Sequence, residues 1–97
     1  MTPPEKPPEF DKVSAIIEER GKVYGDPETG FTNIGLHFTA MVQQHFGITL
    51  DHAIPNWLVA EMMVVFKMHR AARGYHEDSI LDGKAYLKFA EDFQKPR

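Results

Sequence analysis

The sequence contains no cysteine among its 97 residues. Disulfide bridges and thiolate-ligated metal sites are therefore excluded, because both require the cysteine sulfur. Any metal ion bound by this chain must be held by carboxylates and imidazoles. Oxygen ligands of this kind are typical of Mg²⁺ or Mn²⁺.

An excess of positive charge and a long hydrophobic run are also missing. The net charge is −3, whereas proteins that bind duplex nucleic acid usually present a basic surface, so we expect no duplex nucleic acid as a partner. The longest apolar run, residues 57–66, is interrupted by Glu61 and is shorter than the roughly 20 residues that cross a bilayer. The N-terminus lacks an apolar signal core. We expect no membrane partner and a cytoplasmic location.

The length predicts a single domain with one modest core. Residues 1–8 include four prolines, which favour an extended, disordered leader, so the helical domain is expected over residues 9–97. The chain carries 11% aromatic residues, a generous share for its size. A homo-oligomeric interface would explain that surplus.

Four segments show the i, i+3, i+4, i+7 spacing of amphipathic helices. Their apolar residues are, in order, Phe10, Val13, Ile16 and Ile17; Phe31, Ile34, Phe38, Met41, Val42 and Phe46; Val59 and Met62 to Phe66; and Leu81, Ala85, Phe89 and Phe93. No useful β alternation is present. The sequence therefore predicts an all-α fold, an antiparallel four-helix bundle.

The helix ends are marked by capping residues. Gly47 and Gly74 are expected to end the second and third helices. Thr29 or Thr32 is predicted to cap the second helix, and Asp78 or Ser79 the fourth. The third segment, from Trp57 to Arg73 after Pro55, is apolar on nearly every side, which predicts a central helix buried by several neighbours.

Acidic residues supply the candidate metal ligands. Asp78, Asp82 and Tyr86 are spaced i, i+4, i+8, so a helix places them on one stripe where two carboxylates could share a hard cation. The alternative is an ordinary acidic first turn, favoured by the helix dipole. Glu61 is the one acid in an apolar helix, where it needs either a metal ion or a salt bridge to a neighbouring cation.

Basic and polar residues supply the candidate ligand-binding groups. Lys67 and Arg70 lie three apart and could neutralise phosphates, although cations near a helix C-terminus also occur for dipole reasons. A second group of residues flanks the Gly25-Asp26-Pro27 turn. This turn could direct hydrogen-bond donors toward an anion, or its residues could serve only to form the turn. The members of this second group are Arg20, Lys22, Tyr24 and Asn33.

Several common enzyme signatures are absent. The five histidines show no zinc-binding spacing with an acid. The chain has no P-loop, no dinucleotide-binding fingerprint and no Gly-x-Ser-x-Gly. Zinc hydrolase, P-loop kinase, Rossmann and serine hydrolase functions therefore lack their local signals.

Three motifs occur in order and carry a resemblance to a known group. They are Arg20-x-x-x-Tyr-Gly-Asp-Pro-x-x-x-Phe-x-Asn33, then Met62-Met63-x-x-x-Lys67-x-x-Arg70, then Asp78-x-x-x-Asp82-x-x-x-Tyr86. Over roughly Ile17 to Ala90, this pattern resembles small phage and prophage proteins similar to the MazG-like nucleotide pyrophosphohydrolases.

The resemblance implies an all-α fold, assembly as dimers or tetramers, and Mg²⁺-dependent cleavage of a nucleoside triphosphate to monophosphate and pyrophosphate. It also implies a bacterial host cell, with the protein encoded by a phage or prophage. The superfamily carries Glu-x-x-Glu on one helix and Glu-x-x-Asp on the next. Here Glu18 and Glu19 are adjacent, and Asp78 and Asp82 are four apart.

Two functional hypotheses follow. In the enzyme hypothesis, Glu61, Asp78 and Asp82 hold Mg²⁺ or Mn²⁺ and act in catalysis, and the basic and polar residues above bind the nucleotide together with Tyr86. In the rival hypothesis, which the incomplete carboxylate sets favour, the chain is a non-catalytic protein that binds a nucleotide or a host protein. A third alternative is a purely structural oligomer.

Overall fold

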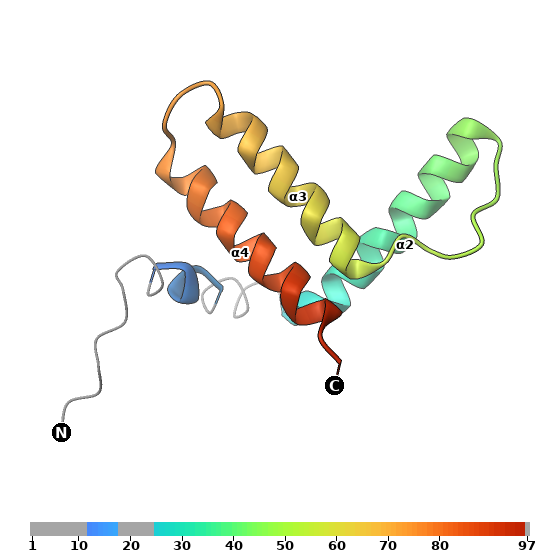
Figure 1. Cartoon of the computed structure of the whole chain (residues 1–97). Coiled ribbons are helices and arrows are strands. Elements are labelled where there is room, and N and C mark those ends of the chain that lie inside the picture. The colour runs from blue at the N-terminus through green and yellow to red at the C-terminus, as the bar shows by residue number, and fades with distance from the viewer. Residues whose placement is uncertain (1–11, 18–24, 97) are drawn as a thin grey trace.

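The computed structural model describes residues 12–17 and 25–96. Within these ranges the regular structure is entirely helical, which confirms the predicted all-α helical bundle (Figure 1). Residues 12–17 form a short helical segment, followed by α2 (Pro27–Phe46), α3 (Asn56–Ala71) and α4 (Glu77–Gln94). The predicted leader, residues 1–8, lies outside the described residues.

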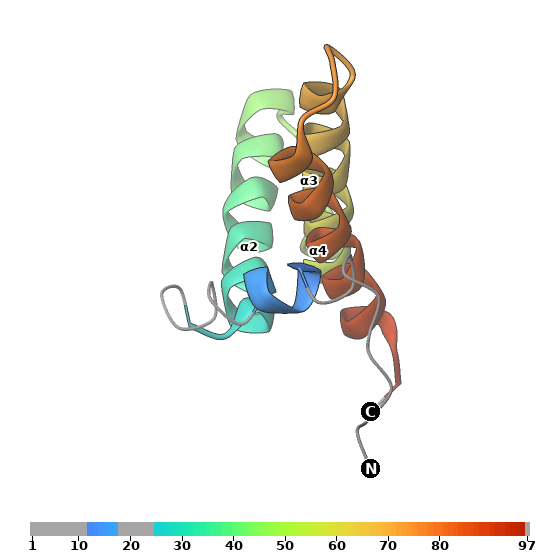
Figure 2. The same ribbon diagram turned by 90° about the vertical axis from the view of Figure 1, so that its left-hand side faces the viewer.

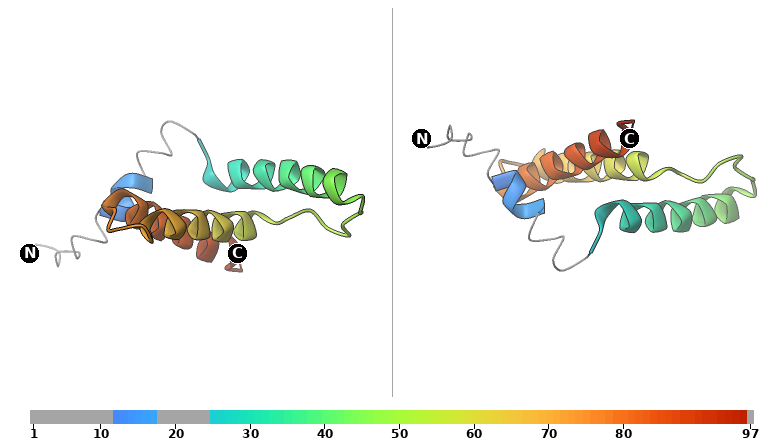
Figure 3. Two further views of the ribbon diagram at one scale, coloured as in Figure 1. Left: turned by 90° about the horizontal axis from the view of Figure 1, so that it is seen from above. Right: turned by 90° about the horizontal axis from the view of Figure 1, so that it is seen from below.

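The helices form two layers. α3 and α4 run antiparallel and pack along most of their length, whereas α2 lies on the other side and contacts mainly α3 (Figure 2, Figure 3). The segment 12–17 lies beside α4, where Lys12 donates a hydrogen bond to Glu77. That hydrogen bond and the charge of Glu77 raise the pKa of Lys12.

The start of α2 corrects a prediction. Asp26 is the N-cap, its carboxylate accepts from the Glu28 amide, and Pro27 occupies the first helical position. Proline is favoured there because its missing amide proton would be unpaired in any case. The proposed caps Thr29 and Thr32 therefore lie inside the helix. At the other end Gly47 has φ 65°, which confirms it as the C-cap.

The start of α4 also differs from the prediction. The N-cap is His76, whose Nδ1 accepts a hydrogen bond from the Ser79 amide at 3.1 Å. Asp78 and Ser79 consequently belong to the first helical turn. Histidine is not among the preferred capping residues, so the usual signal was missing at this position.

The core is small and centred on Phe31. Its ring centroid lies 5.8 Å from those of Tyr86, Phe89 and Phe93, so α2 packs on α4 through aromatic rings. Val59 and Ala60 of α3 and Ala90 of α4 complete the buried cluster.

A connecting segment, residues 48–55, returns along the second half of α2. The Ile54 amide donates to Thr39 Oγ1 at 2.8 Å, and the Leu50 amide donates to Gln43 Oε1 at 2.7 Å. Gly35 allows the Ile54 carbonyl to approach the helix so closely that a Cβ at this position would overlap it. The buried residues of α2, Phe31 and Gly35, both lie in its first half. Figure 1 shows the second half diverging from α3.

α3 is the central helix, because it packs against both α4 and α2, but the prediction that several neighbours bury it is wrong. Only Val59 and Ala60 are buried, and the outward side chains of α3 are exposed. The large exposed ones are Met62, Val65, Phe66 and Met68. Among the described helices, none is long and apolar enough to cross a membrane.

Candidate functional site

A pocket of about 450 Å³ opens between the first turns of α2, the middle of α4 and the segment 12–17. A volume of this size lies within the range of small-ligand sites. The described residues that line it are Ile16, Ile17, Gly25, Asp26, Pro27, Gly30, Phe31, Ile34, Ala85, Tyr86 and Phe89.

The inner wall of the pocket is aromatic. Phe31 meets Tyr86 edge to face, with ring planes at 88°, and Phe89 at 50°. Such a wall presents ring faces and edges to a planar apolar group. Tyr86, a predicted ligand-binding residue, is half-buried here and belongs to the pocket.

The rim at the start of α2 carries negative charge. The Asp26 carboxylate accepts from the Glu28 amide at 3.2 Å and from Thr29 Oγ1 at 2.9 Å, and Glu28 adds a second acid in the first turn. These acids already complement the positive end of the helix dipole, so they disfavour a phosphate at this helix end. The predicted binding residues Arg20, Lys22 and Tyr24 lie outside the described residues.

Lys67 and Asp82 form a buried ion pair between α3 and α4. Lys67 Nζ lies 3.0 Å from Asp82 Oδ2, and the two side chains are 13% and 9% exposed. A buried charge of either sign requires such a partner. Lys67, predicted to meet a phosphate, and Asp82, predicted to hold a metal ion, are therefore paired with each other.

The three candidate metal ligands do not converge. Asp78 lies one helical turn before Asp82, roughly 6 Å along α4, and Glu61 lies six residues before Lys67, roughly 9 Å along α3. Because the helices are antiparallel, these steps lead in opposite directions from the ion pair. Within the part of the chain that the structure describes, no group of three His, Asp or Glu residues could hold a metal ion.

The remaining predicted residues lie apart from the pocket. Arg70 is exposed in the last turn of α3, and Asn33 is exposed on α2 without lining the pocket. Glu61 is half-buried, and the described residues offer it neither an ion pair nor a hydrogen bond.

The pocket residues other than Tyr86 were missed as site residues because their sequence signal is that of a core. Phe31, Ile34, Ala85 and Phe89 occupy the apolar stripes of their helices, and those stripes predict packing. The pocket exists because the start of α2, the middle of α4 and the segment 12–17 come together in the fold, which is a tertiary property. Only the adjoining Gly25-Asp26-Pro27 turn marked this region in advance.

Comparison with known proteins gives one match. A family model described as "Domain of unknown function (DUF6378)" matches residues 10–94, which is most of the chain. No curated protein and no solved structure matches the chain.

Proposed function

This chain belongs to the DUF6378 family of domains of unknown function, and we propose that it binds a nucleotide whose base enters the aromatic pocket. The supporting observation is the pocket of about 450 Å³ walled by Phe31, Tyr86 and Phe89. Stacking of a base on an aromatic side chain contributes about 1–3 kcal/mol and tolerates different bases.

The charge distribution orients the ligand in this proposal. The phosphates point away from Asp26 and Glu28, because like charges repel. The residues expected to meet them are Arg20 and Lys22, whose positions in the sequence immediately precede Gly25 at the pocket.

A matched pair of α2 variants tests the pocket. Ile34 lines it and is 40% exposed, whereas Leu36 is 52% exposed and lies outside it. Ile34→Glu places a carboxylate in the pocket and should remove the rise in melting temperature that a panel of NTPs and dNTPs produces. Leu36→Glu carries the same charge and should retain that rise. Equal loss in both variants would contradict binding at the pocket.

Mg²⁺-dependent pyrophosphohydrolase activity is the second candidate. It is favoured by Glu61, a half-buried carboxylate with no partner among the described residues, because such a group gains from a cation. Glu61, Asp78 and Asp82 do not fit a single Mg²⁺ or Mn²⁺ site within one chain. A site that uses Glu61 therefore needs ligands from beyond the described residues or from a second copy.

Pyrophosphate release from NTPs and dNTPs in the presence of Mg²⁺ tests the enzyme. Glu61→Gln should abolish release and leave the ligand-induced rise in melting temperature intact. Asp82→Ala is a poor probe, because it would strand the buried Lys67 ammonium. Binding without release would leave the nucleotide-binding function alone.

The proposal also includes assembly and location. On the resemblance of the three motifs, we place the protein in the cytoplasm of a bacterial host cell, encoded by a phage or prophage, as a homo-oligomer. The alternative partner is a host protein. Absence of any nucleotide-induced stabilisation would favour that alternative.

A further inference from the structure

The outward face of α3 carries an exposed apolar seam. Half-buried Leu58, exposed Met62 and Val65, and the exposed imidazole of His69 follow a 4-3-4 spacing, which is that of helices packed side by side, and Phe66 adjoins them. At 100° per residue, Met62 and Val65 lie 140° to 160° around the helix from Lys67, which faces α4. The seam therefore points away from the hairpin partner.

The seam is unusually open for apolar side chains. Met62, Val65 and Phe66 are 44%, 69% and 53% exposed, and Met41 and Phe46 of α2 are each 66% exposed. Together they expose on the order of 500 Å² of apolar surface, which is about the size of the largest apolar patch on a typical monomer, and such patches are often functional. Buried reciprocally by two copies, and with a polar rim added, this surface approaches the roughly 800 Å² per partner of a standard interface.

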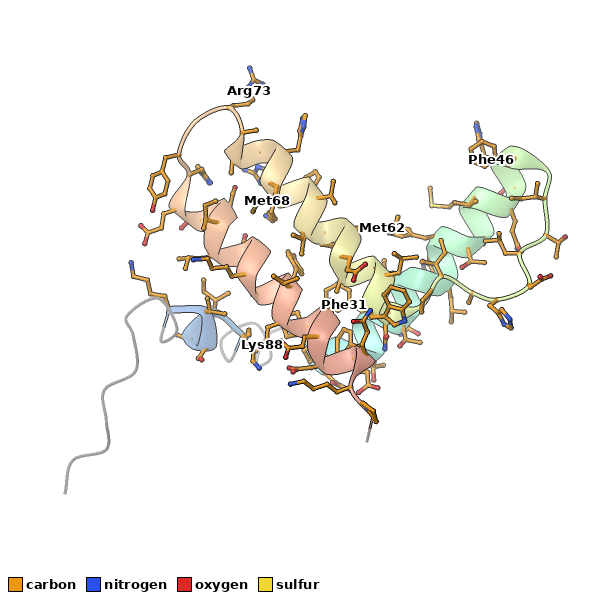
Figure 4. The ribbon with its side chains drawn as sticks, in the orientation of Figure 1. Phe31, Phe46, Met62, Met68, Arg73 and Lys88 are labelled. Atoms are coloured by element: carbon orange, nitrogen blue, oxygen red, sulfur yellow. The ribbon has the colours of Figure 1, made fainter. Side chains whose placement is uncertain are left out.

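The second half of α2 is held in place by hydrogen bonds. The second half of α2 is tied to the connecting segment by the Thr39 and Gln43 hydrogen bonds, yet it buries no residue. Figure 4 shows Met62 on the flank of α3 and Phe46 at the free end of α2, with open space between the two helices.

The charges on α3 favour one orientation of that second helix. Glu61 lies toward the start of α3, whereas its last turn carries His69 and Arg70 and is followed by Arg73. Antiparallel pairing brings each acid near the partner's basic end, whereas parallel pairing would align like charges.

We propose that two copies of this chain form a two-fold dimer in which the seams of their α3 helices pack antiparallel about a point between Val65 and Phe66. This centre pairs Met62 with the partner's His69 and Val65 with the partner's Phe66. Such a contact is isologous, so it closes as a dimer. It places Glu61 beside the partner's last-turn cations, a neighbour that the described residues of its own chain do not provide.

The inference rests on the homo-oligomer part of the proposed function and specifies its interface. Because the chain has no cysteine, single cysteine substitutions give a clean test in the otherwise intact protein. Val65→Cys lies next to the two-fold axis, so the two copies of residue 65 are offset by only about 1.5 Å along the α3 helix axis. In the Met62→Cys dimer, the cysteines of the two copies would lie about 10 Å apart along the α3 helix axis, which is beyond the reach of a disulfide. Leu87→Cys, at an exposed position of α4, serves as the control.

Diamide oxidation should link Val65→Cys into a covalent dimer on non-reducing gels, while Met62→Cys and Leu87→Cys stay single chains. Light scattering should give a dimer mass for the wild type, and circular dichroism should show equal helix content in all variants. Self-linking of Met62→Cys as readily as Val65→Cys would indicate parallel pairing and overturn the proposal. A dimer without Val65→Cys linking would overturn this interface alone, and a monomer would overturn the oligomer as well. Nucleotide-induced stabilisation in the same samples reports separately on ligand binding.

Discussion

At the residue scale, the Lys67–Asp82 pair explains most of the difference between the predicted and observed sites. The two residues were expected to contact a phosphate and a metal ion, but their side chains are 13% and 9% exposed and lie 3.0 Å apart. Inside a helix pair, a carboxylate and an ammonium neutralise each other, and separating them is costly. The pair fixes the register of α3 against α4, which in turn separates Glu61 from Asp78.

Removing one partner of this pair should destabilise the fold strongly. Lys67→Met removes the ammonium that lies 3.0 Å from the buried Asp82 carboxylate and should lower the free energy of unfolding by about 3 kcal/mol in urea denaturation. The double variant Lys67→Met/Asp82→Asn removes both charges and should recover much of that loss, giving a clear coupling energy. Additive losses in the two single variants would contradict a direct pair.

At the element scale, the approach of the connecting segment to α2 depends on one missing side chain. A Cβ on Gly35 would overlap the backbone carbonyl of Ile54, whereas a Cβ on Gly30 would meet nothing within 4 Å. Both glycines lie in α2, so they form a matched pair.

Gly35→Ala should therefore lower the free energy of unfolding by about 1–3 kcal/mol, because backbone must move to admit the methyl group. Gly30→Ala should raise it by about 0.5–1 kcal/mol through helix propensity. Thermal melts of the two variants and the wild type will show which substitution lowers stability and which raises it. Similar shifts in both would show that the connecting segment does not hold this position.

The N-cap of α4 gives a second prediction at this scale. His76 Nδ1 accepts from the Ser79 amide, so His76→Ala should cost about 1 kcal/mol, and His76→Asn should restore most of it because asparagine is a favoured N-cap. Tyr75, the preceding residue, is 85% exposed, and Tyr75→Ala should change stability by less than about 0.5 kcal/mol. Urea melts followed by circular dichroism measure all three.

The helical segments were predictable because periodicity is a local signal, and Gly47 ends α2 as expected, whereas α3 ends at Ala71 with Ala72 rather than Gly74 as its C-cap. The ends at Asp26 and His76 were less predictable. Asp26 precedes a proline in what reads as a turn, and histidine is an uncommon cap. The exposure of α3 was not predictable at all, since an apolar helix looks the same whether its neighbours belong to its own chain or to another. The pocket was missed for the related reason that its aromatic residues also form the core.

At the scale of the whole molecule, the two open apolar features lie on different elements. The pocket joins α2, α4 and the segment 12–17, whereas the seam lies on the outward face of α3. The proposed ligand site and the proposed dimer interface therefore do not share an element. This separation allows variants of one feature to leave the other unchanged.

The proposed dimerisation through the seam predicts that thermal stability depends on protein concentration. Because mass action favours the folded dimer, the wild-type melting temperature should rise as the protein concentration is increased from about 1 to 100 µM. Val65→Glu places a charge at the centre of the seam, so its melting temperature should be lower and independent of concentration. Leu87→Glu carries the same charge at an exposed position of α4 and should retain the wild-type dependence. A wild-type melting temperature that does not move with concentration would show that the seam stays open, and the exposed face of α3 would then need a partner other than a second copy.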